Sequence, residues 1–314
     1  MNVAANEEPW SRRHLLDIQS LSRGEIEQLF TTARSFREVS TRSVKKVPAL
    51  RGRVVVNLFH EPSTRTRISF TLAAQRLSAD VVDFAGDTSS VKKGESLLDT
   101  AQNIIAMGVD TIVLRHPAAG AAQYLAERVG VTVVNAGDGA HAHPTQGLLD
   151  LFTVLDHCQS VDGKRVAIVG DVAHSRVARS DMWAFLRFGA KVTLVGPPTL
   201  VPQSFRELGV EICHSLDEVL PDVDVLVLLR IQKERQGQGL FPSLEEYARL
   251  FGMNEDRLNR MKERAVVLHP GPMNRGIEVT PEVADGERSL ILDQVTNGLA
   301  VRMAALYLTA GGAA

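Results

Sequence analysis

Residues 53–70 read RVVVNLFHEPSTRTRISF, and this stretch decides what is expected of the rest of the chain. Residues 53–59 are dominated by valine, leucine and phenylalanine, which predicts a buried strand. Residues 60–62 end the strand. Ser63 then stands where a helix N-cap is expected, with residues 64–67 in the first turn. A strand that enters a helix through so short a loop presents backbone N–H groups at the positive end of the helix dipole, which is an anion site.

The side chains of this turn suit a phosphate group. Ser63, Thr64 and Thr66 supply hydroxyl groups, and an arginine fork can bind two phosphate oxygens. Arg65 and Arg67 lie roughly 200° apart around a helix, so we expect Arg65 on the ligand and Arg67 in a structural role. The stretch lacks the glycine-rich loop of a nucleotide P-loop. The competing interpretation is a capped helix with solvated arginines.

A Ser-Thr-Arg-Thr-Arg turn after a buried strand resembles the carbamoyl phosphate signature of the aspartate and ornithine carbamoyltransferases. The resemblance implies that Ser63, Thr64, Arg65 and Thr66 bind carbamoyl phosphate. Four further motifs, spaced along nearly the whole chain, extend this resemblance.

Length and composition describe a globular protein of two domains. A chain of 314 residues is too long for one core. Its net charge of −2, with no basic block, argues against nucleic acid or an anionic membrane as a partner. Two cysteines give neither a disulfide framework nor paired metal spacing. The first residues lack the apolar core of a secretion signal, and no apolar run reaches membrane-span length, so we expect a cytoplasmic protein.

Strand and helix patterns alternate along the chain, which predicts an α/β fold of two domains, each a parallel sheet flanked by helices. We expect the first domain to comprise residues 1–143 and the C-terminal helix 290–314, and the second to comprise residues 144–289. The expected strands are 53–59, 81–84, 111–114, 131–135, 165–170, 191–195, 210–213, 224–229 and 266–268. Ser22 and Glu25 form a capping box, which predicts that a helix starts after Ser22. The other expected helices cover 64–77, 96–107, 119–128, 144–157 and 290–308. Polar groups at the carboxyl ends of these strands predict a ligand cleft between the domains.

Two more motifs of the first domain carry candidate site residues. Arg115 follows a buried strand, and by the resemblance it binds the carbonyl oxygen. Residues 143–146 read HPTQ, with the proline suited to the first helical position. By the resemblance His143 and Gln146 bind the carbamoyl group. His141 and His143 alone, without a nearby cysteine or carboxylate pair, are weak grounds for a metal site, and we expect no metal.

Residues 85–96, AGDTSSVKKGES, are polar and aperiodic, which predicts a loop. A solvated loop is the simpler interpretation. The resemblance implies that Ser89 and Lys93 reach the active site of a neighbouring subunit, so that a homotrimer has shared sites.

The second domain supplies separated arginines. Arg176 opens a helix after a strand, and Arg230 and Gln232 share one side of an extended segment. Two guanidinium groups suit a small dicarboxylate. The GDVAHSRVARS sequence that leads into Arg176 is not a GxGxxG fingerprint, which weakens a dinucleotide-binding interpretation. The Pro- and Gly-rich HPGPM motif contains Gly271 and Pro272, and it favours a fixed backbone whose carbonyl groups face a ligand.

These second-domain motifs distinguish among relatives. The chain lacks the Ser-Met-Gly and His-Cys-Leu-Pro motifs of ornithine enzymes, and its RIQKE and HPGPM motifs match aspartate carbamoyltransferases of the bacterial type. The resemblance implies carbamoyl transfer from carbamoyl phosphate to L-aspartate, in pyrimidine biosynthesis, without cofactor or metal. Two alternatives stay open. One is a carbamoyltransferase for another amino acid such as ornithine, and the other is a non-catalytic subunit of a pyrimidine-pathway complex. Regulatory chains or a dihydroorotase are possible additional partners by the same resemblance.

The resemblance also assigns roles. The oxyanion would be held by Thr66, Arg115 and His143. The leaving phosphate would be bound by Ser63, Thr64, Arg65 and Lys93. The carbamoyl amide would be oriented by Gln146 and the backbone of Pro270, Gly271 and Pro272. The two carboxylates of aspartate would be bound by Arg176, Arg230 and Gln232, with Lys93 contributing from the neighbouring subunit.

Overall fold

A computed structural model describes residues 10–85, 95–231 and 243–311. The chain forms two compact units. The first unit is Met1–Leu148 with Thr296–Ala314, and the second is Leu149–Val295. The units change within helix α5 (Pro144–Cys158) and helix α11 (Ile291–Thr309), a few residues after the boundaries expected at the starts of these helices. Each of these helices contains residues of both units. A sequence pattern therefore locates the start of the helix and not the boundary between the units.

The first unit contains a four-stranded sheet in which every neighbouring pair is parallel. Its strands are β1 (Val54–Phe59), β2 (Asp80–Ala85), β3 (Thr111–His116) and β4 (Thr132–Asp138). Their order across the sheet is β2-β1-β3-β4. The predicted strands are confirmed, but β3 and β4 run two and three residues further than the apolar pattern indicated, because Arg115, His116 and Asp138 still pair in the sheet.

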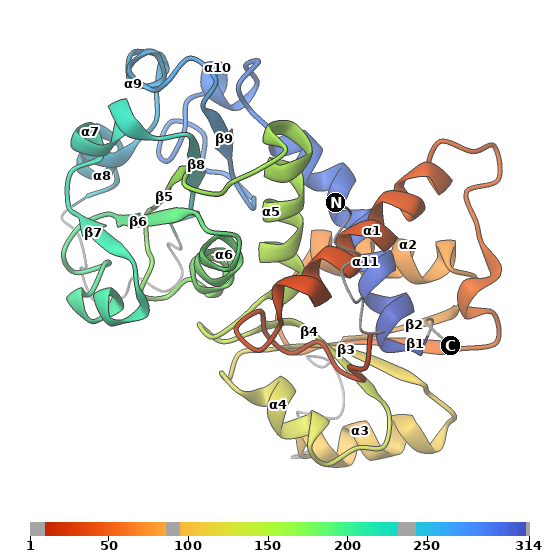
Figure 1. The fold of residues 1–314 in the computed structure, drawn as a ribbon. Helices are drawn as coiled ribbons and strands as arrows, with labels where there is room; N and C mark the ends of the chain where they lie inside the picture. The colour runs from red at the N-terminus through yellow and green to blue at the C-terminus, as the bar shows by residue number, and fades with distance from the viewer. Residues whose placement is uncertain (1–9, 86–94, 232–242, 312–314) are drawn as a thin grey trace. The chain divides into compact units, whose positions relative to one another are not determined.

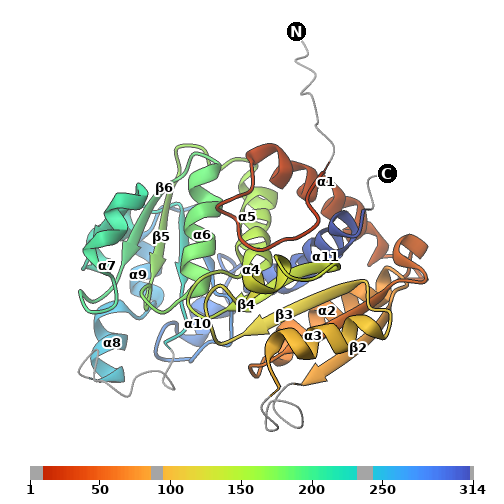
Figure 2. The same ribbon diagram turned by 90° about the horizontal axis from the view of Figure 1, so that it is seen from below.

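Helices cover both faces of this sheet (Figures 1 and 2). On one face α3 (Leu97–Ala106) and α4 (Ala121–Ala126) pack against the strands in one apolar cluster, which includes Leu58, Ile104 and Leu125. The other face carries α1 (Arg23–Val39), α2 (Thr64–Arg76) and the later part of α11. Thr132 of β4 donates to the carbonyl oxygen of Thr309 at the end of α11, at 3.1 Å. The capping box predicted at the start of α1 is confirmed.

One buried amide fixes α2 over the sheet. Asn57 interrupts the apolar run of β1 and is fully buried. Its Nδ2 donates to Thr71 Oγ1 of α2 at 2.9 Å and to Asp83 Oδ1 of β2 at 2.7 Å. A buried amide is costly unless it is hydrogen-bonded, so these bonds specify how α2 sits on β1 and β2.

The second unit contains a five-stranded parallel sheet in the order β7-β6-β5-β8-β9. Its strands are β5 (Arg165–Val169), β6 (Lys191–Val195), β7 (Glu211–Cys213), β8 (Val225–Leu228) and β9 (Val266–Leu268). Its further helices are α6 (Arg176–Arg187), α7 (Leu216–Val219), α8 (Leu244–Phe251), α9 (Glu255–Arg260) and α10 (Pro281–Ala284). The helices α7 to α10 share one apolar cluster with a face of the sheet, and α6 packs on β5 and β6.

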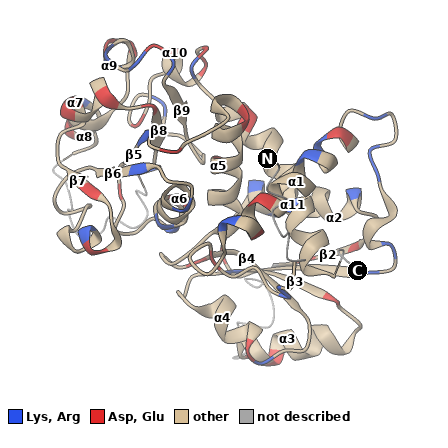
Figure 3. Cartoon of the chain, in the orientation of Figure 1, with Lys and Arg blue, Asp and Glu red and all other residues tan. Residues whose placement is uncertain are grey.

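Charge is spread evenly over the chain. Figure 3 shows basic and acidic residues interspersed in both units. In the described part of the chain, no helix is long and apolar enough to cross a membrane.

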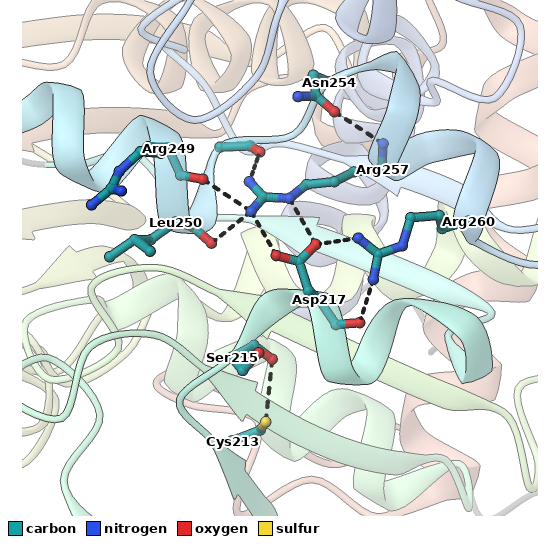
Figure 4. A network of polar contacts seen from close by, with 9 residues as sticks. Cys213, Ser215, Asp217, Arg249, Leu250, Asn254, Arg257 and Arg260 are labelled. Carbon is teal, nitrogen blue, oxygen red and sulfur yellow. Dashed lines mark hydrogen bonds and ion pairs between the residues drawn. The ribbon is translucent and has the colours of Figure 1, made fainter.

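A charged network joins three helices of the second unit (Figure 4). Arg257 of α9 donates to both carboxylate oxygens of Asp217 in α7, at 3.1 and 2.9 Å. It also donates to the carbonyl oxygens of Arg249, Leu250 and Gly252 at the end of α8. Its side chain is only 11% exposed. Arg257 therefore satisfies carbonyl groups that the end of α8 leaves without helical partners.

Replacing Arg257 by methionine should destabilise the second unit. The loss of charge-assisted bonds is expected to lower the free energy of unfolding by about 1.5–3 kcal/mol, measured by urea titration followed by circular dichroism. The hydrogen bond from Arg257 lowers the pKa of Asp217, although burial opposes it. The bonds of Arg257 therefore stabilise the fold fully at pH values above the pKa of Asp217 in the unfolded chain. As the pH falls through the lower pKa of Asp217 in the folded chain, the difference in free energy of unfolding between the native chain and Arg257→Met should narrow.

Arg275→Met is the matched control, because Arg275 pairs with Asp285 on the exposed surface. An exposed pair contributes little, so this variant should unfold close to the native chain. Equal destabilisation by both variants would contradict the role assigned to the Asp217 network.

Candidate active site

Both sheets place the candidate residues at the carboxyl ends of their strands, next to the strand where the winding direction reverses. In the first sheet β1 is flanked by β2 on one side and β3 on the other. In the second sheet β5 lies in the same way between β6 and β8. Loops that follow such neighbouring strands diverge in opposite directions, and open parallel sheets bind ligands at this point.

The turn after β1 is arranged for an anion. Ser63 occupies the N-cap position of α2, but its side chain makes no capping hydrogen bond. The first turn of α2 has no acidic residue, whereas α1, α3 and α8 each begin with one or more carboxylates. Thr64 and Arg65 are exposed, and Thr66 is half-buried. Arginine at the positive end of a helix dipole is unfavourable by itself and becomes favourable beside a bound anion.

Arg115 lies near the end of β3, directly beside this turn. Its backbone carbonyl accepts from the backbone N–H of His60 at 2.8 Å. Its Nε lies 3.3 Å from Glu61 Oε2, and its Nη1 donates to the carbonyl oxygen of Ala136 at 3.1 Å. The Arg115 and Glu61 side chains are only 13% and 15% exposed. The guanidinium group is thus fixed at the carboxyl edge of the sheet, between the β1 turn and the end of β4.

His143 and Gln146 reach the same edge through a loop that Asp138 organises. Both side chains are buried, with His143 directly before α5 and Gln146 in its first turn. Asp138 is 1% exposed. Its Oδ1 accepts from the backbone N–H of Ala142 at 3.1 Å, and its Oδ2 accepts from that of Gly120 at 2.7 Å. This buried carboxylate therefore closes the turn between β4 and α5.

The two histidines of the HAH sequence have different surroundings. The His141 side chain is 45% exposed, and its Nδ1 lies 3.0 Å from Asp138 Oδ2. His143 is 4% exposed. Among residues 10–85, 95–231 and 243–311, no group of three or more His, Cys, Asp or Glu side chains is placed to hold a metal ion.

Arg176 and Arg230 follow the adjacent strands β5 and β8. Arg176 is buried in the first turn of α6, where Ser175 accepts the capping bond from the backbone N–H of Ala178 at 3.1 Å. Arg230 is half-buried. Gly170, which directly follows β5, has φ +133°, and a Cβ there would lie 3.0 Å from the Cβ of Leu229. Only glycine therefore lets the turn after β5 pass so close to the segment that carries Arg230.

Glu278 ties the Arg230 segment to the loop after β9. Its Oε1 accepts from the backbone N–H of Ile231 at 2.8 Å and from Asn274 Nδ2 at 2.6 Å. Its Oε2 accepts from the backbone N–H of Asn274 at 2.6 Å. Burial raises the pKa of Glu278, and the hydrogen bonds from Asn274 and Ile231 oppose that rise. In this way Glu278 fixes the residue next to Arg230 against the loop that contains Gly271 and Pro272.

The structure therefore groups the candidate residues by unit. Ser63, Thr64, Arg65, Thr66, Arg115, His143 and Gln146 lie at the carboxyl edge of the first sheet. Arg176, Arg230, Gly271 and Pro272 lie at the carboxyl edge of the second. Ser89, Lys93 and Gln232 lie outside the described residues.

Sequence reasoning missed the carboxylates that hold this framework: Glu61, Asp138 and Glu278. Asp138 had a usable signal, because an Asp in a glycine-containing loop commonly accepts nearby backbone N–H groups. Glu61 had none, because its partner Arg115 is distant in sequence, and nothing local indicated that Glu278 also binds the backbone N–H of Ile231.

Family models match both halves of the chain. Residues 13–156 match the model described as aspartate/ornithine carbamoyltransferase, carbamoyl-P binding domain. Residues 162–309 match the model described as aspartate/ornithine carbamoyltransferase, Asp/Orn binding domain.

Several curated proteins and solved structures are similar to this chain over almost their whole length. The aspartate carbamoyltransferase catalytic subunit of Opitutus terrae is 57% identical, with 97% of each chain covered. That of Halothermothrix orenii is 55% identical, with 96% of each covered. Aspartate transcarbamoylase from Trypanosoma cruzi, in complex with carbamoyl phosphate and aspartate, has a TM-score of 0.86 at 32% identity, covering 96% of this chain and 98% of that one. The catalytic subunit of M. Jannaschii aspartate transcarbamoylase has a TM-score of 0.82 at 34% identity, covering 94% of this chain and 97% of that one.

The family models and the relatives agree with the two parallel-sheet units of the fold, and the chain belongs to the aspartate/ornithine carbamoyltransferase family.

Proposed function

We propose that this chain transfers the carbamoyl group of carbamoyl phosphate to L-aspartate, which gives N-carbamoyl-L-aspartate and phosphate in pyrimidine biosynthesis. The observation that carries the proposal is the division of polar groups between two sheet edges. Hydroxyl groups and Arg65 at the first edge suit a phosphate, and Arg176 and Arg230 at the second suit a dicarboxylate. The similarity to aspartate carbamoyltransferase catalytic subunits, at 57% identity for one of them, supports the same substrates.

The phosphate group of the donor would bind at the start of α2. Backbone N–H groups of the first turn, the hydroxyls of Ser63, Thr64 and Thr66, and the Arg65 guanidinium would share its charge. These groups bind the same oxygens after the phosphate has left, so they stabilise it as a leaving group.

The carbonyl group would be polarised by Arg115, His143 and Thr66. Arg115 is already fixed by Glu61 and Ala136, so little reorganisation is needed when negative charge develops on the carbonyl oxygen. Gln146 and the backbone of residues 270–272 would orient the carbamoyl amide.

The acceptor would be held by its two carboxylates on Arg176, Arg230 and Gln232. Its amine attacks the carbonyl carbon, a C–N bond forms, and the bond between that carbon and the phosphate oxygen breaks. The electron pair leaves with the phosphate, which can accept the amine proton. No covalent enzyme intermediate is required, so positioning and charge stabilisation account for the catalysis.

The proposal includes a homotrimer in the cytoplasm, with Ser89 and Lys93 of one subunit completing the site of its neighbour. Its support is the resemblance of residues 85–96 to the loop that does this in the family. Regulatory chains or a dihydroorotase as further partners belong to the same proposal.

An acceptor panel tests the reaction. The purified chain should form N-carbamoyl-L-aspartate and phosphate from carbamoyl phosphate and L-aspartate, measured by phosphate release and chromatography of the product. L-Ornithine should not be carbamoylated, because two arginines repel the cationic side chain of ornithine. Turnover of ornithine without aspartate would assign the chain to the other branch of the family. A folded chain inactive with both would favour a non-catalytic role.

Arg115→Ala should lower kcat by roughly 10²- to 10³-fold through loss of a preorganised donor to the oxyanion. Steady-state kinetics at saturating substrates measure the effect, and circular dichroism verifies the fold. Arg128→Ala is the control, because Arg128 is an exposed residue after α4 that contacts Tyr124 and Glu127. Undiminished turnover in a folded Arg115→Ala protein would remove Arg115 from the mechanism.

Lys93 and Arg65 variants should complement each other if sites are shared. Lys93→Ala and Arg65→Ala should each be inactive alone. After subunit exchange, the mixture should regain activity at those sites that receive a native Lys93 from one subunit and a native Arg65 from its neighbour. A mixture that exchanges subunits, shown by native mass spectrometry, and still stays inactive would refute the shared site.

A further inference from the structure

Two neighbouring carboxyl groups are buried in the interior of the second unit. Asp150 of α5 and Asp181 of α6 are both fully buried, with exposed fractions of 0%. Both the charge of Asp150 and a side-chain interaction with it raise the pKa of Asp181, so the two carboxyl groups are near neighbours. Neither residue belongs to the mechanism described above. Two buried carboxylates in contact cannot both stay ionised, because desolvation and like-charge repulsion both oppose the second charge.

The surroundings assign one proton to this pair. Gln294 Nε2 of α11 donates to Asp150 Oδ1 at 2.6 Å, which favours the ionised form of Asp150. Within the described residues, no N–H group or hydroxyl donates to either carboxyl oxygen of Asp181. If Asp181 is protonated, its own O–H donates to Asp150, and Asp181 is no longer a buried carboxyl group without a hydrogen bond.

Asp150 is connected to the proposed carbamoyl site through the side chains of Gln294 and His269, which accept backbone N–H groups of the loop after β9. Gln294 is oriented by both ends of its amide, since its Oε1 accepts from the backbone N–H of His269 at 2.9 Å. The Nδ1 of His269 in turn accepts from the backbone N–H of Gly271 at 2.8 Å. Hydrogen bonds therefore run from Asp150 through Gln294 and His269 to the loop that contains Gly271 and Pro272, and a proton donated by Asp181 to Asp150 would extend them to Asp181.

We propose that Asp181 is a neutral, proton-donating positioning residue, which holds Asp150 and Gln294 so that the backbone at residues 269–271 is set for the carbamoyl group. The second part of this statement rests on the proposed function.

The charges around the pair are consistent with one retained proton. Burial raises the pKa of Asp181 well above its usual value, and the charge of Asp150 and the hydrogen bond between them add to the rise. The partner from α11, Gln294, is neutral. The loop after β9 contributes the His269 backbone N–H to Gln294, while the His269 ring lies 3.9 Å from Glu278.

The sign of the pH effect follows. A carboxyl group with a raised folded pKa stabilises the fold fully below its unfolded pKa, and this contribution is lost as the pH rises toward the folded value. Asp181→Asn keeps a donor to Asp150 without a titrating proton. Its free energy of unfolding should therefore improve relative to that of the native chain as the pH rises from 5 to 9.

Infrared difference spectroscopy of the full chain tests the proton directly. The native protein at pH 7 should show the C=O stretch of a buried carboxylic acid, and Asp181→Asn should lack it. Asp156→Asn, an exposed position on the same helix as Asp150, should keep the band. A native protein without the band, or Asp181→Asn with an unchanged band, would overturn the acid pair whether or not the chain transfers carbamoyl groups.

Kinetics test the positioning role. Asp181→Ala and Gln294→Leu should each lower kcat/KM for carbamoyl phosphate about 10-fold, whereas Asp181→Asn should stay within about 3-fold of the native value. The double variant Asp181→Ala/Gln294→Leu should lose no more than either single variant, because both break one chain of bonds. Circular dichroism at the assay temperature confirms that each variant is folded.

Additive losses in the double variant, or a loss in Asp181→Asn equal to that in Asp181→Ala, would overturn the positioning role. A native chain that shows the carboxylic acid band and yet does not turn over carbamoyl phosphate would instead refute the proposed function, and with it the assignment of residues 269–271 to the carbamoyl group.

Discussion

The order of the strands in two parallel sheets is the constraint on which the candidate site depends. In each sheet the first strand is internal, and later strands add on both of its sides. The loops and helices that follow neighbouring strands must then diverge at the carboxyl edge. Helix N-termini also point toward this edge, so it collects positive potential. This topology supports the proposed binding of an anion at each edge.

Buried carboxylates make these edges rigid. Loops between strands and helices have no regular ladder to satisfy their N–H groups, and Asp138 and Glu278 supply the missing acceptors. Glu61 has a related role, because it fixes the guanidinium of Arg115. Groups held in this way cost little reorganisation when charge develops on a substrate, which is what the proposed carbamoyl transfer requires. The Asp150–Asp181 pair extends the same principle one layer deeper, with a proton in place of a backbone donor.

Much of this protein was predictable because the relevant signals are local. The run of apolar residues before Ser63 predicted β1, the Ser22–Glu25 pair predicted the start of α1, and Pro144 predicted the start of α5. Strand-to-helix turns with hydroxyl groups and arginines indicated the candidate site. The ends of β3 and β4 were predicted too early, because polar residues at a strand end look like a loop until their pairing partners are known.

The sequence by itself determined the strands, the helices of the first unit and α6, the alternation that makes the fold α/β, and the residue types of the candidate site, but it did not indicate the short helices α7 to α10. Only the tertiary structure decided the strand order, the change of unit within α5 and α11, and the partners that hold the site. The reason is separation along the chain. Glu278 binds the N–H of a residue 47 positions away, and Gln294 binds Asp150 across 144 positions. No local pattern encodes such pairs, because they exist only after the strands have assembled.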